Sequence, residues 1–260
     1  MNVMKMFDLT GKVAVITGAG NGLGCQFAEA MAEAGADVVC GDIDMENNER
    51  TAERVRQIGK KALVVKCDVT REAEVAALFQ AADKAFGSVD IAFANAGIAD
   101  PAPQPLHDYP SDNWHAVLAV NLTGVFYTDR EALKIMSRQR RGKLINVASM
   151  WGLAGASSVL PLPAYNATKG AVVNLTRELA LEYAAQNIQV NALCPGFFHT
   201  RIAGGAYDNP DFVATISAFT PMGRLAEASE IKGTALYLAS AASSYTTGLM
   251  LVTDGGCMAK

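Results

Sequence analysis

The sequence predicts an α/β fold in which helices cover both faces of a doubly wound parallel sheet. The predicted strands are continuous apolar runs, which is typical of strands that are buried on both faces. These runs alternate with helical patterns along the chain, and that order produces a parallel sheet with right-handed crossovers. No linker or shift in composition divides the 260 residues, so residues 1–260 are predicted to form a single domain.

The elements follow from the apolar runs and from the stop signals between them. Seven runs are predicted as strands: 13–16, 38–40, 62–65, 89–94, 144–148, 188–193 and 250–253. Helices are predicted over residues 23–34, 46–58, 72–86, 112–138, 165–185 and 229–239. Gly35 and Gly59 end the first two helices, and a proline-rich loop precedes the long helix at 112–138. Residues 200–223 are expected to be irregular or partly helical.

The composition limits the classes of partner. Hydrophobic residues make up 50% and charged residues 18% of the chain, which supports a substantial core and argues against disorder. The net charge of −4 argues against nucleic acid, because phosphate recognition needs clustered Lys and Arg. The one dense basic run, at 138–141, is better explained as a solvated helix end. A small-molecule partner is therefore expected.

The cysteines, the histidines and the N-terminus indicate a cytoplasmic protein without a metal. The five cysteines are spread along the chain without a Cys-x-x-Cys pair, so free thiols in a reducing compartment are expected. The three histidines form no spaced set of ligands. Lys5 and Asp8 interrupt the N-terminus before any apolar signal sequence develops. Two long uncharged stretches, 144–168 and 233–253, contain Pro, Asn, Ser or Thr and are expected to be core elements rather than membrane spans.

A glycine-rich turn follows the first predicted strand and begins the first helix. The N-terminus of such a helix can hold a pyrophosphate. The residues predicted to contact it are Gly18, Asn21, Gly22, Leu23 and Gly24. The spacing differs from Gly-x-Gly-x-x-Gly, and an ordinary strand–helix turn is the alternative. The position between a strand and a helix favours dinucleotide binding.

Polar residues at the ends of the next strands extend the predicted dinucleotide site. Asp42 lies 18 residues after Gly24, where its carboxylate can accept both hydroxyls of the adenosine ribose, with Ile43 beside it. Because no Lys or Arg lies in the turn or directly after Asp42, NAD is favoured over NADP. Ligands of open α/β sheets bind beyond the carboxyl ends of the strands, where two further groups are found, although each alone is also compatible with a cap or turn. They are Asp68-Val69 and Asn95-Ala96-Gly97.

Tyr165 and Lys169 are the residues that indicate the chemistry. Residues four apart share one face of a helix. An ammonium beside a phenol lowers the pKa of the phenol from its usual value of about 10, and the phenol then becomes a proton-transfer group near neutral pH. Together with the glycine turn, this pair predicts redox chemistry on an alcohol or a carbonyl.

The motifs, taken in order, resemble those of the short-chain dehydrogenase/reductase family over nearly the whole chain. They are Thr17-Gly18-x-x-x-Gly22-x-Gly24, Asp68, Asn95-Ala96-Gly97, Asn121, Ser149, Tyr165-x-x-x-Lys169, Pro195-Gly196 and Thr200. The resemblance implies a seven-stranded Rossmann fold. It also implies a homotetramer in which the helices 112–138 and 165–185 pair across an interface.

The resemblance assigns roles to the residues. Tyr165 acts as general base in oxidation and general acid in reduction, and Lys169 lowers its pKa and binds the nicotinamide ribose. Ser149 donates a hydrogen bond to the reacting oxygen, and Asn121 holds a water that connects Lys169 to solvent. The nicotinamide is flanked by Pro195, Gly196, Phe198 and Thr200.

Two departures from the family pattern stand out. Ala94 occupies a position where many relatives carry a second asparagine, and little consequence is expected. The separation of Ser149 and Tyr165, 16 positions, is longer than usual for the family. The extra length lies within 150–164 and is expected to reshape the substrate pocket without moving Ser149, the alternative being a harmless surface bulge.

The substrate side is predicted to combine apolar walls with a lid at about 197–223. The expected walls are Met150, Trp151, Leu160, Phe197 and Phe198. Trp151 either stacks on a sugar ring or packs in the core. Gly204-Gly205 is a candidate hinge, and His199 is a loop residue that can also hydrogen-bond the substrate. Arg201 either faces a carboxylate or sulfonate or makes a surface pair.

Three functions follow from these residues. The lid sequences at 208–212 and 220–224 resemble those of sugar-acid dehydrogenases of the gluconate 5-dehydrogenase type, which favours NAD-dependent oxidation of a sugar, polyol or sugar acid, including anionic ones. Similar lids occur in 3-oxoacyl thioester reductases, which form the second hypothesis, although these usually use NADPH and Asp42 opposes it. A catalytically silent binding protein is the third, and the intact catalytic set argues against it.

Overall fold

The computed structural model describes residues 2–260 and contains one parallel seven-stranded sheet with the order β3-β2-β1-β4-β5-β6-β7. The strands are β1 Val13–Thr17, β2 Asp37–Asp42, β3 Ala62–Lys66, β4 Ile91–Ala94, β5 Gly142–Val147, β6 Ile188–Pro195 and β7 Met250–Thr253. The chain runs from β1 outward to β3 and then crosses to β4 on the other side of β1. The strand order therefore reverses beside the end of β1, which is where open α/β sheets bind ligands. The predicted fold class is confirmed.

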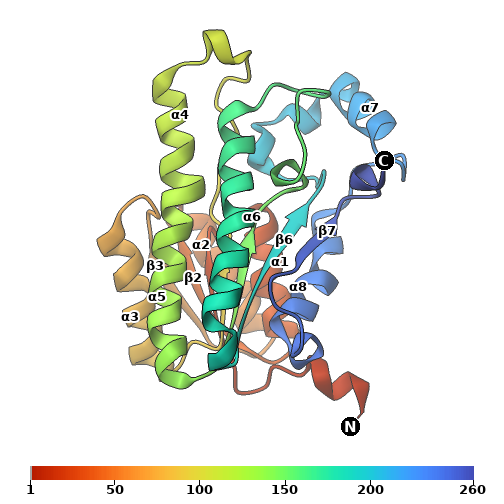
Figure 1. The fold of residues 1–260 in the computed structure, drawn as a ribbon. Helices are drawn as coiled ribbons and strands as arrows, with labels where there is room; N and C mark the ends of the chain where they lie inside the picture. Colours follow the sequence, from red (N-terminus) through yellow and green to blue (C-terminus); the bar gives the residue numbers. More distant parts are fainter. Residues whose placement is uncertain (1) are drawn as a thin grey trace.

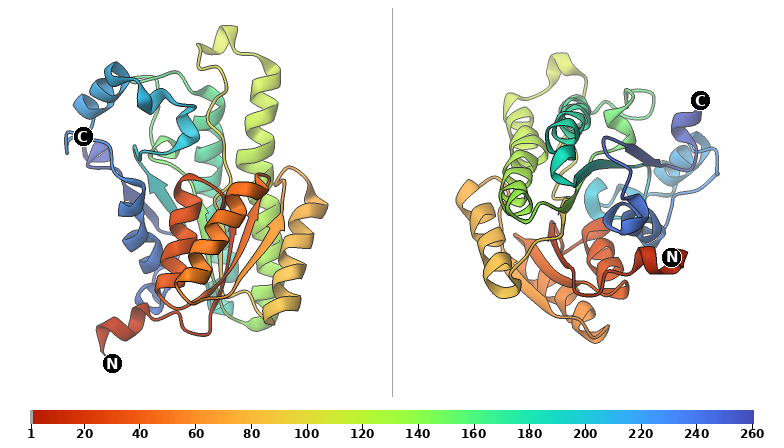
Figure 2. Two further views of the ribbon diagram at one scale, coloured as in Figure 1. Left: turned by 180° about the vertical axis from the view of Figure 1, so that it is seen from behind. Right: turned by 60° about the horizontal axis from the view of Figure 1, so that its bottom comes forward.

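Helices cover both faces of this sheet (Figures 1 and 2). They are α1 Gly22–Glu33, α2 Met45–Gln57, α3 Glu72–Phe86, α4 Ser111–Leu118, α5 Gly124–Gln139, α6 Pro163–Tyr183, α7 Pro210–Phe219 and α8 Lys232–Ala239. α1, α2 and α8 pack on one face, and α3, α5 and α6 pack on the other. Within residues 2–260, no helix is long and apolar enough to cross a membrane.

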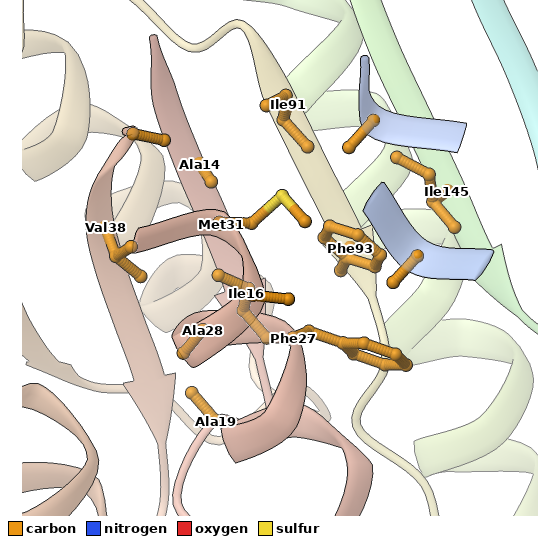
Figure 3. Packing of buried hydrophobic residues seen from close by; sticks show 14 of the residues in the cluster. Ala14, Ile16, Ala19, Phe27, Ala28, Met31, Val38, Ile91, Phe93 and Ile145 are labelled. Atoms are coloured by element: carbon orange, nitrogen blue, oxygen red, sulfur yellow. The ribbon is translucent and has the colours of Figure 1, made fainter. Parts of the chain in front are cut away.

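Each inner strand supplies side chains to both layers of the core. Ala14 and Ile16 of β1 face α1, while Val13 and Val15 face the opposite layer. On the α1 side, the rings of Phe27 and Phe93 stack with their centroids 4.8 Å apart (Figure 3). Because successive strand side chains point to opposite faces, a sheet that is covered twice needs apolar residues at every position. This requirement explains the continuous apolar runs in the sequence.

The helix predicted at 112–138 is not one regular helix. A π-helical turn, Ala119–Thr123, separates α4 from α5, and Gly124 N–H donates to the carbonyl of Ala119 across it. Asn121 lies inside this turn and is fully buried. Its side chain donates to the Ile98 carbonyl and accepts from the Ile98 amide, both at 2.8 Å. The irregularity is thus tied to a loop 23 positions away, which a local helical pattern does not reveal.

The lid, residues 197–223, consists of two short 3₁₀ helices followed by α7. Gly204 and Gly205 lie between the 3₁₀ helices and have φ of 60° and 88°, a left-handed conformation that favours glycine. The ends of the lid are joined to one another, because His199 N donates to Ala226 O at 2.8 Å and Ala226 N donates to Phe197 O at 3.0 Å. Figure 1 shows α7 beyond the carboxyl end of the sheet, and the N-terminus at the opposite end.

Candidate active site

The glycine turn is fixed by close approach of backbone atoms. A β-carbon at Gly24 would lie 2.0 Å from the Gly18 carbonyl oxygen, so no larger residue fits there. Gly18 has φ of 68°, and a β-carbon on it would lie 2.8 Å from Ala96 Cα. The Asn95 side chain donates to the carbonyls of Thr17 at 2.9 Å and Gly18 at 3.1 Å. The loop after β4 therefore holds the turn in place.

The N-terminus of α1 is open to an anion. Asn21 occupies the N-cap position, but its side chain makes no capping bond and instead reaches Asp44 Oδ2 at 3.5 Å. The first backbone N–H groups of a helix lack partners within the helix, and they suit a phosphate. Leu23 packs against the core, and a β-carbon on Gly22 would lie 3.4 Å from Thr200 Cβ. The turn thus lies directly against the start of the lid.

A carboxylate closes the far side of the turn. Asp42 is 9% exposed, and its oxygens accept from Gly20 N at 2.7 Å and from Asp44 N at 2.8 Å. Ile43 is 61% exposed beside it. Within residues 2–260, no Lys or Arg forms an ion pair with Asp42 or Asp44. This corner therefore carries negative charge that no cation pairs with in the described residues. A dinucleotide fits the open helix terminus and this carboxylate together.

The residues after β3 border the same site. Asp68 Oδ1 accepts from the Thr70 amide at 2.9 Å and from the Thr70 hydroxyl at 2.7 Å. Val69 is buried and contacts the start of α5, because a β-carbon on Gly124 would lie 2.8 Å from Val69 Cγ2. The turn made by Asp68 is the alternative that the sequence left open, and the second carboxylate oxygen remains available beyond it.

The four predicted catalytic residues come from three parts of the chain and meet at the carboxyl end of the sheet. Tyr165 and Lys169 lie on the first turns of α6, and Ser149 lies two positions after the end of β5. Lys169 is 3% exposed, and its ammonium donates to the Val147 carbonyl at 2.7 Å. Its Nζ lies 5.6 Å from the centroid of the Tyr165 ring. A β-carbon on Gly97 would lie 3.4 Å from Asn121 Oδ1 and 3.6 Å from Lys169 Nζ, so both residues border Gly97.

The pKa of Tyr165 differs from the sequence-based prediction. Burial raises the pKa of this phenol, a hydrogen bond with the Ser149 hydroxyl opposes the rise, and the charge of Asp100 adds to it. Burial also lowers the pKa of Lys169 to about 8. The predicted lowering of the Tyr165 pKa is therefore wrong for the protein alone. Burial is the largest contribution to this rise, and the Lys169 ammonium, which is hydrogen-bonded to the Val147 carbonyl, does not offset it.

The end of β6 is close to the end of β7. Pro195 is the last residue of β6, and Gly196 N donates to the Thr253 carbonyl at 2.9 Å. A β-carbon on Gly196 would lie 2.6 Å from Asp254 Cα. Phe198 is 4% exposed and its side chain packs in the core on the α1 face. The Phe198 side chain therefore lies mainly in the core, and its roles as a pocket wall and as a cofactor contact stay predictions.

An aromatic cluster borders Tyr165 on the substrate side. Trp151 is 7% exposed, and its ring lies 6.0 Å from Phe197 and 5.8 Å from Phe219 between centroids. Tyr165 packs against the same cluster. Trp151 is thus a packing residue, as in the second alternative of the sequence analysis. The walls around the phenol are mainly apolar.

The segment 150–164 is packed against the site rather than bulging from the surface. The Asn166 side chain donates to the carbonyls of Trp151 at 2.8 Å and Ala154 at 2.7 Å. A β-carbon on Gly152 would lie 2.6 Å from the Lys169 carbonyl oxygen. Leu162 packs on the aromatic cluster, while Leu160 is only partly buried. The extra length therefore contributes to the wall while Ser149 stays at the strand end.

Two residues of the site were missed by sequence reasoning. Tyr207, on the lid, lies close enough to Tyr165 that the charge of a Tyr165 phenolate raises its pKa, and burial brings the pKa of Tyr207 to about 12. Asp100 accepts from the backbone N–H of Tyr165 at 3.3 Å. The signal for Tyr207 was an aromatic residue just after Gly204-Gly205. The predicted substrate residues His199 and Arg201 are exposed on the lid, and the His199 ring lies 6.2 Å from Tyr207.

Comparison with known proteins gives a consistent family. A family model described as enoyl-(acyl carrier protein) reductase matches residues 18–258. The chain is 42% identical over 245 residues to a cis-4-hydroxycyclohexanecarboxylate dehydrogenase of Sinomonas cyclohexanicum, covering 94% of this chain and 96% of that protein. It is 34% identical over 253 residues to 5-keto-D-gluconate 5-reductase of Escherichia coli, covering 97% and 98%.

A solved structure shows the same fold. The crystal structure of a gluconate 5-dehydrogenase from Burkholderia cenocepacia, in complex with NADP and tartrate, is 36% identical and superposes with a TM-score of 0.93 over 100% of both chains. Sequence, fold and site agree, and the chain belongs to the short-chain dehydrogenase/reductase family of oxidoreductases.

Proposed function

We propose that the protein is an NAD-dependent dehydrogenase that oxidises a secondary hydroxyl group of a small carboxylated substrate. The observation that carries this proposal is the meeting of Ser149, Tyr165 and Lys169 beside the glycine turn. Two relatives are named for substrates in which a carboxylate lies several carbons from a hydroxyl or ketone. Both names therefore suggest a substrate that carries a hydroxyl group or ketone together with a distant carboxylate.

The chain's own residues supply the proton chemistry. A bound nicotinamide accepts the hydride in oxidation and supplies it in reduction. In oxidation, the phenolate form of Tyr165 accepts the proton of the substrate hydroxyl group, while Ser149 donates a hydrogen bond to the reacting oxygen. Lys169 binds the nicotinamide ribose, and its ammonium favours the phenolate. The Asn121 side chain makes two hydrogen bonds with the Ile98 backbone. We therefore assign the water that connects Lys169 to solvent to the main-chain carbonyl of Asn121.

The cofactor preference rests on Asp42. Its buried carboxylate and the neighbouring Asp44 present two negative charges where NADP carries its 2′-phosphate, and no cation pairs with either in residues 2–260. The Burkholderia relative binds NADP, so the preference has to be measured on this chain. Fluorescence titration with NADH and NADPH is expected to give at least about tenfold tighter binding of NADH. Equal affinities would contradict the assignment of NAD.

The apolar walls favour a cyclic hydroxy acid as a second candidate substrate beside a sugar acid. The partly buried rings of Phe197 and Phe219, which pack on Trp151, offer apolar surface for an alicyclic ring and few partners for the hydroxyls of a polyol. A panel of hydroxycyclohexanecarboxylates, aldonates, neutral polyols and, in reverse, acetoacetyl thioesters separates the classes. Oxidation of a carboxylated alcohol supports the proposal, and turnover confined to thioesters would replace it with an oxoacyl reductase.

The role of Tyr165 has its own test. Tyr165→Phe removes the proton-transfer oxygen, and a loss of at least about a hundredfold in kcat is expected while the Kd for NADH stays within about twofold of the unmodified protein. Tyr237→Phe is the control, because Tyr237 lies on α8 and its hydroxyl bonds Thr246 instead. Retained turnover in Tyr165→Phe would refute the mechanism.

Assembly and location complete the proposal. Phe126 on α5 and Leu181 on α6 are 45% and 80% exposed, which suits burial between subunits of a homotetramer. Analytical ultracentrifugation showing a stable monomer would refute this assembly.

The five cysteines are buried free thiols, which suits a reducing compartment such as the cytoplasm.

A further inference from the structure

Asp100 is a buried carboxylate between the cofactor loop and the catalytic helix. It follows β4 by six positions and is 4% exposed. One oxygen accepts a hydrogen bond from the Tyr109 hydroxyl, and the other accepts from the backbone N–H of Tyr165 at 3.3 Å. Within residues 2–260, no Lys, Arg or His lies within ion-pair distance of it. Burial raises the pKa of Asp100, and the two hydrogen bonds, rather than a cation, partly offset that rise.

The catalytic helix needs this carboxylate at its N-terminus. Leu162 occupies the N-cap position of α6 and offers no side-chain acceptor, and Pro163 has no N–H group. The N–H of Tyr165 is one of the amides that lack a partner within the helix. Asp100 provides the acceptor from 65 positions away, and a negative charge at a helix N-terminus is favourable. The first turn of α6 is thereby tied to the loop that carries Gly97.

The charge of Asp100 also acts on the Tyr165 phenol. The groups that face this phenol are Ser149 after β5, Cys194 on β6, Tyr207 on the lid, Lys169 on α6, and Asp100. Burial raises the pKa of Cys194 to about 11 and that of Tyr207 to about 12, so both are neutral near pH 7. Asp100 is then the carboxylate that opposes the Lys169 ammonium. A nearby negative charge disfavours a phenolate.

We propose that Asp100 is a positioning residue for Tyr165: it caps the helix that carries Tyr165 and Lys169, and its negative charge adds to the effect of burial in favouring the protonated Tyr165 phenol. This inference rests on the proposed role of Tyr165 as the proton-transfer group. The charge of Asp100 then contributes, together with burial, to the pH at which Tyr165 loses its proton. Asp100 favours the protonated phenol that carbonyl reduction uses, and it raises the pH at which alcohol oxidation begins.

The test measures ionisation of Tyr165 directly. The protein is labelled with [¹³Cζ]tyrosine, saturated with NAD, and titrated by NMR, with the Tyr165 resonance assigned from Tyr165→Phe. Asp100→Asn keeps an oxygen acceptor for the Tyr165 amide but removes the charge. The midpoint for Tyr165 is expected to fall by at least about 0.5 pH unit. Asp108→Asn is the matched control, because Asp108 is an exposed carboxylate on the same connection and pairs with His107.

The outcomes separate this inference from the proposed function. A lower midpoint in Asp100→Asn, with Asp108→Asn unchanged, supports it, and the acid limb of kcat/KM for alcohol oxidation then moves to lower pH by the same amount. A midpoint equal to that of the unmodified protein overturns it. The NMR titration needs no substrate, so a wrong substrate class leaves its result intact. Asp100→Ser, also neutral, replaces Asp100→Asn if thermal melts show that the asparagine variant does not fold.

Discussion

The glycine turn and the lid touch one another, yet they are held by different kinds of contact. In the turn, backbone atoms approach so closely that a single β-carbon at Gly24 would collide at 2.0 Å. In the lid, aromatic rings meet at centroid distances of about 6 Å, such as Tyr207 with Phe212 at 5.9 Å, and many residues are exposed. The turn therefore tolerates almost no substitution, whereas the lid tolerates many. The turn is thus fixed by the shape of the backbone, and the lid is held by contacts between side chains.

The largest effect is expected from adding one methyl group to the turn. Gly24→Ala places a β-carbon against the Gly18 carbonyl, and the free energy of unfolding should fall by about 3 kcal/mol, with NADH binding lost. Gly233→Ala is the control, because Gly233 also lies in the first turn of a helix but a β-carbon there has open space. That variant should gain about 0.5 kcal/mol. Chemical denaturation measures both, and equal effects would contradict the close packing of the turn.

A second change tests the cofactor side through charge rather than shape. Asp42→Ala removes the acceptor for the ribose hydroxyls, and the Kd for NADH should rise about tenfold to a hundredfold while that for NADPH rises less. Asp37→Ala, at the start of the same strand, removes a carboxylate that accepts from Lys61 N and should leave both affinities unchanged. Fluorescence titration measures both Kd values. If Asp42→Ala keeps the same preference between NADH and NADPH, residues other than Asp42 distinguish the two cofactors.

On the lid, a smaller and purely functional effect is expected. Arg201 is exposed and has no ion-pair partner within residues 2–260, so it is free to meet a substrate carboxylate. Arg201→Gln should raise KM for a carboxylated alcohol about tenfold without changing the melting temperature. Arg224→Gln breaks the exposed pair with Glu230 and should leave KM unchanged. If Arg201→Gln has the KM of the unmodified enzyme, the carboxylate is bound by another group.

The smallest effect is expected in the pH dependence of the free energy of unfolding. Burial raises the pKa of Cys40, next to the cofactor corner, to about 12, whereas an unfolded thiol titrates near 8.5. The folded state then holds more protons than the unfolded state between these values, so stability falls as pH rises. At pH 9.5 the loss is about 1.4 kcal/mol for this thiol. Cys40→Ala should show a shallower decline of unfolding free energy from pH 8 to pH 9.5, and an identical slope would contradict this account.

The sequence predicted what local patterns determine. The strands, the glycine turn and the Tyr165–Lys169 pair depend on periodicity and short spacing, and the structure has them where they were predicted. The π-turn at Asn121 and the capping of α6 by Asp100 depend on partners 23 and 65 positions away. The pKa of Tyr165 depends on burial, which a spacing of four residues does not report. Long-range contacts and burial therefore account for the features that the sequence did not predict.

The paired ends of the lid have a consequence for how such enzymes diverge. Because Phe197 and His199 bond to Ala226, the segment between them begins and ends at nearly the same point, just beyond the end of β6. Everything between these anchors is an inserted module, and the entropy of closing a loop grows only slowly with its length. Insertions, deletions or exchanges of this module leave β6 and β7 undisturbed. New substrate ranges can therefore be acquired on an unchanged dinucleotide-binding scaffold.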